Sequence, residues 1–276
     1  MRKILFVCLL FCILSFTQEE TSKEYEIKYL FTKGSNVSYS LKIDTIEKLN
    51  ISGQYNEKKR KVVIDFDQIV ENVDENGNGI IKMKYLGGSY DGIKVDLAGK
   101  EVTLKRNSKG EILESVGLEE LSAEFVKIIQ KSLSDYVPGF DRIPVKIDFS
   151  KFDSNMFNVY LESFTPVFPD KKIKIGESWE KEIMIPIFFT KGTLVYTLEK
   201  IEDNKAYINV SITKKQIKGT GELIFDIEKG YIIEQNLSIR GENVKTKVDL
   251  GQYAPQYAQS FDISGSVIIK ISLFAK

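Results

Sequence analysis

Leu118-Glu-Glu-Leu-Ser-Ala-Glu-Phe-Val-Lys-Ile-Ile-Gln-Lys-Ser-Leu-Ser-Asp-Tyr136 is the one long stretch of this sequence with the periodicity of a helix. Its apolar side chains recur at three- and four-residue spacing, which places them on one helix face. That face contains Leu118, Leu121, Phe125, Ile128 and Tyr136. Pro138-Gly139 follows as a stop signal, since proline cannot continue the backbone hydrogen bonds of a helix. The stretch predicts a long amphipathic helix over residues 118–136.

The sequence on both sides of this helix alternates with period two, as β-strands do. Tyr25, Ile27 and Tyr29 alternate with charged residues, and short strands follow at regular spacing between Gly- and Asn-rich turns. A single helix with a broad apolar face must bury that face against the sheet. We therefore expect a mostly β (β-rich α+β) protein, built as a curved antiparallel sheet, an open barrel or a sandwich. The helix packs on the concave face, either as part of the core or as a lid.

Two short matches, in the same order, suggest two related halves. Phe31-Thr-Lys-Gly34 recurs as Phe189-Thr-Lys-Gly192, and Lys109-Gly110 parallels Lys229-Gly230 within hairpins. The poorly patterned stretch 141–165 is expected to be a long connection. We accordingly divide the chain into residues 18–165, which include the helix, and residues 166–276.

Residues 1–17 have the layout of a secretory signal peptide. Met1-Arg2-Lys3 precedes an apolar run that is too short for a comfortable transmembrane helix. The protein is therefore expected to be exported, periplasmic or extracellular, with no stable transmembrane span in the mature chain. Lipoprotein anchoring at Cys12 and an uncleaved N-terminal anchor are the alternatives. Cleavage after residue 17 would remove both cysteines and with them disulfide and thiol chemistry.

Charge and composition argue against several classes of function. The chain has 39 basic and 39 acidic residues, and removal of Arg2 and Lys3 leaves a net charge of −2. This balance gives no electrostatic reason to expect nucleic acid as a partner. The basic run 58–61 reads as a solvated hairpin end. The absence of histidine from the sequence removes the commonest general base and metal ligand.

The motifs that suggest chemistry all have a structural reading that is stronger. Asp74-x-Asn76-x-Asn78-Gly79 resembles the start of a calcium loop, but Tyr85 stands where a bidentate Glu is needed, so we read a hairpin turn. The spacings Ser178-x-x-Lys181 and Ser211-x-x-Lys214 lie in predicted strands, where they place the two side chains on opposite faces. We therefore assign no catalytic, cofactor-binding or metal-binding residue, and no binding residue.

Paired carboxylates leave one enzymatic alternative, a carboxylate-dependent hydrolase. Asp65 and Asp67 share a strand face, but a solvated face explains them more simply. Trp179, the only tryptophan, is expected to anchor the connection between the halves to the core.

Phe168-Pro-Asp-Lys-Lys-Ile-Lys-Ile-Gly-Glu-Ser-Trp179, followed by hairpins with Lys-Gly turns, resembles a group of uncharacterised secreted bacterial proteins and lipoproteins. The resemblance implies an envelope location and a β-rich fold, and it brings no catalytic residues. An antiparallel sheet with one helix against it is also similar, at the level of the fold, to periplasmic lipoprotein carriers.

These observations favour an exported, non-enzymatic envelope protein that binds or carries a lipophilic ligand under the helix. The alternative is a structural or adaptor protein of the envelope that has no small-molecule ligand and instead contacts another envelope protein.

Substitution of Phe125 or Ile128 by Asp distinguishes a core helix from a lid. If the helix is core, either variant unfolds the first half of the chain, because a buried unpaired carboxylate is strongly unfavourable. If the helix is a lid, circular dichroism and thermal unfolding stay unchanged and only ligand binding is lost.

Overall fold

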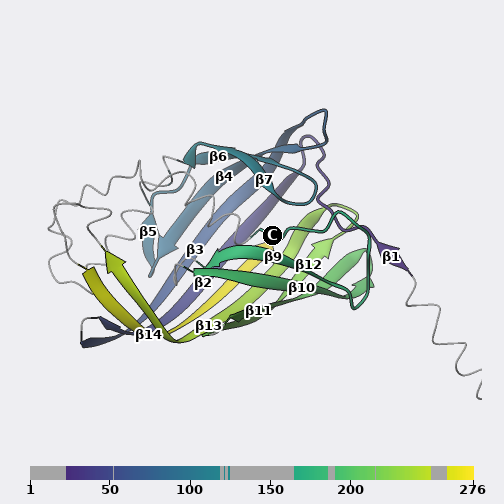
Figure 1. Cartoon of the computed structure of the whole chain (residues 1–276). Coiled ribbons are helices and arrows are strands. Elements are labelled where there is room, and N and C mark those ends of the chain that lie inside the picture. Colours follow the sequence, from purple (N-terminus) through teal and green to yellow (C-terminus); the bar gives the residue numbers. More distant parts are fainter. Residues whose placement is uncertain are drawn as a thin grey trace, which may run out of the picture.

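The computed structural model describes residues 23–51, 53–118, 121, 124, 165–185, 190–214, 216–249 and 260–276. These residues form one 12-stranded antiparallel sheet and a separate two-stranded sheet (Figure 1). The strands are β1 (Glu24–Tyr25), β2 (Asn36–Ile51), β3 (Gln54–Val73), β4 (Gly79–Tyr90), β5 (Ile93–Val95), β6 (Glu101–Arg106), β7 (Ile112–Val116), β8 (Ile173–Lys174), β9 (Ser178–Ile185), β10 (Thr190–Glu202), β11 (Lys205–Lys214), β12 (Ile217–Asp226), β13 (Tyr231–Asp249) and β14 (Ser260–Ala275).

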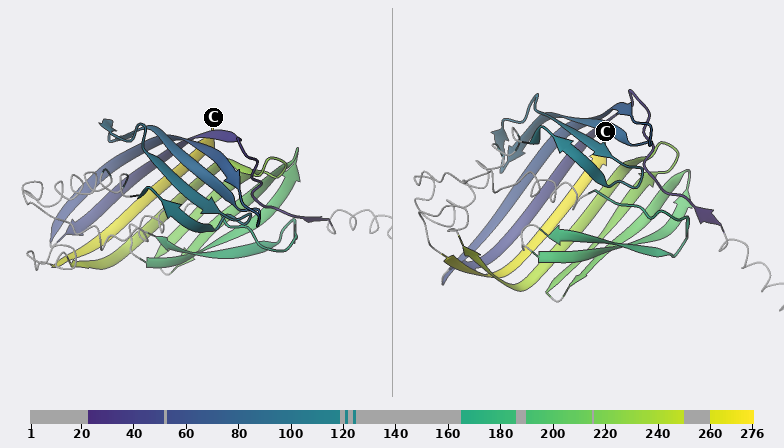
Figure 2. Two further views of the ribbon diagram at one scale, coloured as in Figure 1. Left: turned by 90° about the horizontal axis from the view of Figure 1, so that it is seen from above. Right: turned by 45° about the horizontal axis from the view of Figure 1, so that its top comes forward.

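The large sheet consists of two meanders that meet at its centre. Its order is β7-β6-β4-β3-β2-β14-β13-β12-β11-β10-β9, with β5 paired to β4. The last strand, β14, lies between β13 and β2 and so joins the C-terminal part of the chain to the N-terminal part. We call the strands from β2 to β7 the N-terminal wing and those from β9 to β13 the C-terminal wing. The sheet curves so that its two wings lie on opposite sides of the interior, as the view from above shows (Figure 2). It is an open sheet with edge strands β7 and β9, not a closed barrel.

Period-two alternation decides which side chains face the interior. In β6, Val102, Leu104 and Arg106 are buried while the residues between them are more exposed. In β12, Leu223 and Phe225 point inward in the same way. Buried side chains from both wings belong to one continuous core. We call the face that carries them the inner face and the opposite, more exposed face the outer face.

The segment between β1 and β2 closes one end of the interior by contacting a hairpin turn in each wing. The Tyr29 amide donates to the Ser108 carbonyl (2.7 Å), in the β6–β7 turn. The Leu30 amide donates to the Gly230 carbonyl (3.4 Å), in the β12–β13 turn. The chain beyond residue 165 joins the same end, where β8 pairs with β1 and the Phe168 amide donates to the Lys109 carbonyl (2.9 Å).

The prediction of a mostly β, antiparallel protein is confirmed. Most of the predicted helix 118–136 lies outside the described residues. Of it, Leu118, Leu121 and Glu124 are described, and all three are helical and buried. The predicted signal peptide at 1–17 and residues 141–164 of the predicted connection 141–165 also lie outside. Within the described part of the chain, no helix has the length and hydropathy needed to cross a bilayer.

The two sequence matches behind the predicted repeat differ in the structure. Gly34 adopts a positive φ of 84° in a turn, whereas Gly192 lies within β10, paired with Ile183. Gly110 and Gly230, by contrast, both occupy hairpin turns with positive φ, and both turns contact the segment between β1 and β2. The division into halves at residues 165/166 stays a prediction, and both sides of it contribute strands to one sheet.

Gly230→Ala is expected to destabilise the protein far more than Gly34→Ala. Both glycines have positive φ, 72° and 84°, so each alanine introduces backbone strain of about 1 kcal/mol. A Cβ at Gly230 would also lie 2.1 Å from the Leu30 nitrogen, whereas at Gly34 it meets nothing within 4 Å. Urea unfolding should therefore show an additional loss of about 1–3 kcal/mol for Gly230→Ala. Equal losses would show that the close approach to Leu30 contributes nothing.

Candidate functional site

The inner face presents apolar rows that run across the strands. One such row, set by strand register, contains Tyr196, Val210, Leu237, Ile271 and Ile43. Gly221 lies in this row between Val210 and Leu237. The neighbouring row contains Leu194, Ile212, Ile239 and Ile269. Most of these side chains are at least 96% buried. The C-terminal wing and the centre of the sheet thus share one continuous apolar surface, which is almost entirely buried.

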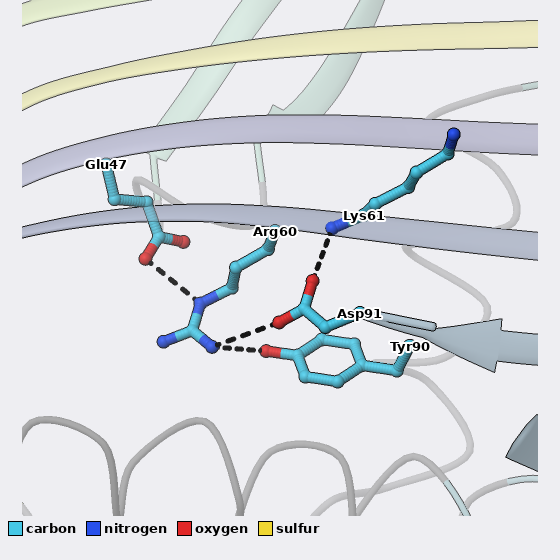
Figure 3. Close-up of polar contacts among 5 residues, drawn as sticks. All are labelled: Glu47, Arg60, Lys61, Tyr90 and Asp91. Atoms are coloured by element: carbon cyan, nitrogen blue, oxygen red, sulfur yellow. Dashed lines mark hydrogen bonds and ion pairs between the residues drawn. The ribbon is translucent and has the colours of Figure 1, made fainter. Parts of the chain in front are cut away.

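This surface becomes polar where it passes from β14 to β2 and β3. The second row continues from Ile269 to Thr45 and then to Arg60, which is only 7% exposed. Arg60 Nε donates to Glu47 Oε2 (3.2 Å), and Nη1 donates to the Tyr90 hydroxyl (2.6 Å) and lies 3.9 Å from Asp91 Oδ2 (Figure 3). We call these four residues the Arg60 cluster.

The local backbone explains how the Arg60 cluster forms. Asp91 follows β4 in a tight turn with a positive φ of 49°, and its Oδ1 accepts a hydrogen bond from the Lys61 amide (2.6 Å). This turn holds the Asp91 carboxylate beside Arg60. Two carboxylates therefore flank one buried guanidinium, so its charge is fully compensated. The prediction that run 58–61 is a solvated hairpin end is wrong for Arg60, because alternation turns this residue to the inner face.

A second buried arginine, Arg106, lies at the closed end of the inner face and has a different environment. It is 5% exposed, and its guanidinium carbon lies 5.3 Å from the centre of the Tyr29 ring. Its Nε is buried and has no hydrogen-bond partner. Among the residues that the structure describes, no carboxylate lies within 4.0 Å of it. Burial raises the pKa of Tyr29 to about 12, with Arg106 opposing the shift, so this phenol stays neutral near pH 7.

Aromatic side chains fill the closed end around Tyr29. Phe168 packs 5.4 Å from Tyr29 and 4.6 Å from Phe225, measured between ring centres. Trp179 stacks on Tyr196 at 5.4 Å, and its Nε1 donates to the Val167 carbonyl (2.8 Å). The prediction that Trp179 anchors the connection to the core is confirmed by these contacts.

The calcium-like motif forms a turn whose carboxylate is already engaged. Asp74 Oδ1 accepts the amides of Asn76 (3.0 Å) and Asn78 (2.9 Å), and Oδ2 lies 2.8 Å from Lys105 Nζ. The Lys105 contact is the main reason that the pKa of Asp74 lies well below its ordinary value. Among the described residues, no group of three or more acidic side chains is arranged to hold a metal ion.

The serine–lysine spacings bring no pair together. Ser178 Oγ bonds with Thr197 Oγ1 (2.8 Å), whereas Lys181 Nζ donates to the Thr165 carbonyl (2.7 Å). Lys214 Nζ donates to the Lys191 carbonyl.

The paired aspartates on β3 are each engaged with another side chain. Asp65 pairs with Lys276 (2.6 Å), which lowers the pKa of the carboxyl, and Asp67 accepts a hydrogen bond from Ser38 Oγ (2.6 Å). A general acid of a glycosidase needs the opposite shift, a raised pKa.

A hollow of about 660 Å³ lies on the outer face, across β10 to β14. Short polar side chains line it, including Thr197, Asn209, Ser211, Thr220, Asn236, Ser238 and Ser272, together with Glu222 and Lys270. Its lining combines these hydrogen-bonding side chains with apolar atoms, including those of Val210, Leu237 and Ile271, so it differs from the apolar concavity that the sequence predicts. We call it the outer groove.

Sequence reasoning missed both buried arginines and the outer groove. For Arg106 a signal existed, since it continues the apolar alternation of Val102 and Leu104. For the outer groove, only the strand register brings its residues together.

The fold and the inner face define a protein built on a single open antiparallel sheet with an apolar interior. A family model matches residues 47–250, and the chain belongs to this family, a family of unknown function (DUF6263). A search of curated proteins gives no match. Among solved structures, the chain is similar to lipovitellin, from a study of its lipid–protein interactions, with 9% identity and a TM-score of 0.42. The match covers 89% of this chain and 25% of lipovitellin, and it assigns no function.

Glu47→Gln is expected to lower the free energy of unfolding by about 1.5–3 kcal/mol, because it removes a charged partner from a buried guanidinium. The matched control is Glu202→Gln, which breaks the exposed pair with Lys200 and should cause no measurable change. Denaturant unfolding of both variants at pH 7 tests the difference. Equal effects would mean that the Arg60 cluster contributes no more than a surface ion pair.

Proposed function

We propose that the protein is an exported, non-enzymatic binding protein of the cell envelope that holds a lipophilic ligand against its inner face. The observation that carries the proposal is the continuous apolar surface formed by the rows around Ile271 and Ile269. A hydrocarbon chain that enters such an apolar interior gains about 25 cal/mol for each Å² of its own surface that is removed from water. The signal-peptide pattern at 1–17 supports export.

The architecture also supports a binding role. An open sheet leaves its interior accessible from a side that hydrogen bonding does not close, unlike a barrel whose strands pair all the way round. The aromatic packing around Tyr29 closes one end of the interior. Ligand would therefore lie along the strands between this closed end and the Arg60 cluster. In the part of the chain that the structure describes, the calcium-like, serine–lysine and paired-aspartate motifs are engaged in structural contacts.

The outer groove favours a second candidate, a structural or adaptor role. Its hydroxyl and amide side chains, such as Ser238 and Asn236, offer both donors and acceptors to a polar partner. In this case the apolar interior serves only as a core, and the outer face makes the functional contact.

Native mass spectrometry of the full chain, gently purified from its own host, distinguishes the two candidates. The binding function predicts a co-purifying lipophilic species in a fixed ratio to the chain, lost on extraction with organic solvent. Ser238→Arg, which obstructs the outer groove, should retain the bound species. A β-rich protein carried through the same procedure controls for lipid that adheres to any surface. A clean ligand-free mass would contradict lipid binding and favour the structural role.

A further inference from the structure

The outer face carries a local concentration of positive charge, although the chain as a whole has 39 basic and 39 acidic residues. Strand register aligns its members in two neighbouring rows that cross β12, β13, β14, β2 and β3. The first row contains Lys218, Arg240, Ile268, Ile46 and Lys59. The second row, two residues away on each strand, contains Thr220, Ser238, Lys270, Asp44 and Lys61. We call the five cations of these rows the basic band.

Little negative charge lies close to the basic band. All five of its side chains are exposed. Arg240 Nε pairs with Glu242 Oε1 (2.7 Å), and Asp44 lies between Lys270 and Lys61 in register. Five cations against these two carboxylates leave a local net charge of +3. The four lysines of the band form no salt bridge with any residue that the structure describes. Figure 3 shows the side chain of one of them, Lys61, extending away from the Arg60 cluster.

The arrangement of the basic band does not favour the folded chain on its own. Lys218 lies directly opposite Arg240 in the β12–β13 pair. Like charges in such positions destabilise a sheet. On β4, by contrast, Lys84 lies in register with Asp67 on one side and Glu101 on the other. The repulsion within the basic band would be relieved by an anionic partner.

The composition and spread of the basic band indicate the kind of partner. It crosses five strands and so extends over about 20 Å. Four of its five cations are lysines, which are depleted from protein–protein interfaces, where aromatic and arginine anchors dominate. Between the cations, Ile268 and Ile46 face outward opposite each other and are half-buried. Flexible cations around a small apolar patch suit a membrane surface, where mobile anionic head groups cover hydrocarbon.

We propose that the basic band docks the protein onto a membrane surface that contains anionic phospholipids. The inference goes beyond the proposed function and does not rest on it, because the outer face makes the contact whether or not the inner face holds a ligand. Each lysine beside an anionic membrane surface strengthens binding by about fivefold. Several lysines together therefore produce binding that depends on both the lipid charge and the salt concentration.

The test is co-flotation of the protein with lipid vesicles. The protein and its variants are purified from their own host and mixed with vesicles of phosphatidylcholine alone or of equimolar phosphatidylcholine and phosphatidylglycerol. Wild type should float with the mixed vesicles only and should be released by about 0.5 M salt, which screens the charges. The double variant Lys59→Thr/Lys218→Thr should bind the mixed vesicles about tenfold to thirtyfold more weakly.

A matched double variant controls for net charge. Lys84→Thr/Lys205→Thr removes two lysines from β4 and β11, outside the basic band. Lys205, like Lys84, lies in register with two carboxylates, those of Glu202 and Asp226. This control should bind the mixed vesicles within about threefold of wild type, because neighbouring carboxylates already offset both charges. Urea unfolding should show that Lys59→Thr/Lys218→Thr is at least as stable as wild type, since it removes one of two opposed like charges.

Three results would overturn membrane docking by the basic band. They are equal binding of wild type to both kinds of vesicle, equal weakening by the two double variants, and no binding of wild type to the mixed vesicles. The third result would leave an acidic protein as the partner of the band. Native mass spectrometry decides separately whether the inner face holds a ligand, so a ligand-free chain that still floats with mixed vesicles contradicts only the proposed function.

Discussion

The contact of residues 29 and 30 with both wings of the sheet is the constraint on which the rest of the structure depends. A curved sheet open along one side has nothing in its own hydrogen bonding to set the distance between its wings. Here the amides of Tyr29 and Leu30 bond to turns that belong to different wings, and the Tyr29 ring lies 5.3 Å from both Arg106 and Phe225. The turn glycines are required by this closeness. A Cβ at Gly110 would lie 2.4 Å from the Pro166 carbonyl oxygen.

The same contact gives the inner face two different ends. At one end, Tyr29 and its aromatic neighbours exclude water, so a charge placed there is costly unless it is paired. At the other end, the inner face meets the Arg60 cluster, where the carboxylates of Glu47 and Asp91 supply that pairing within the protein. Both arginines continue an apolar alternation on the inner face. The two ends therefore differ in the partners of the arginine and not in its position within the strand pattern.

The sequence predicted the class of fold well because period-two alternation and turn residues are local signals. It could not predict strand order, since nothing local indicates that β14 would lie between β13 and β2. It also failed where alternation and charge disagree. Arg60 lies in a run of cations, which predicts exposure to solvent, yet its position in the alternation turns it inward. Whether a buried charge has a partner depends on register between strands, so the difference between Arg60 and Arg106 could not have been read from the sequence.

The outer groove shows how local backbone geometry can produce polar and apolar surfaces on the two sides of one strand. In β12, Gly219 and Gly221 take inner-face positions, and a Cβ at Gly221 would lie 2.2 Å from the Asn236 carbonyl oxygen. The missing side chains let β13 approach β12 closely while Thr220 and Glu222 project outward into the groove. The apolar rows therefore continue on either side of a strand that contributes little surface of its own at this point.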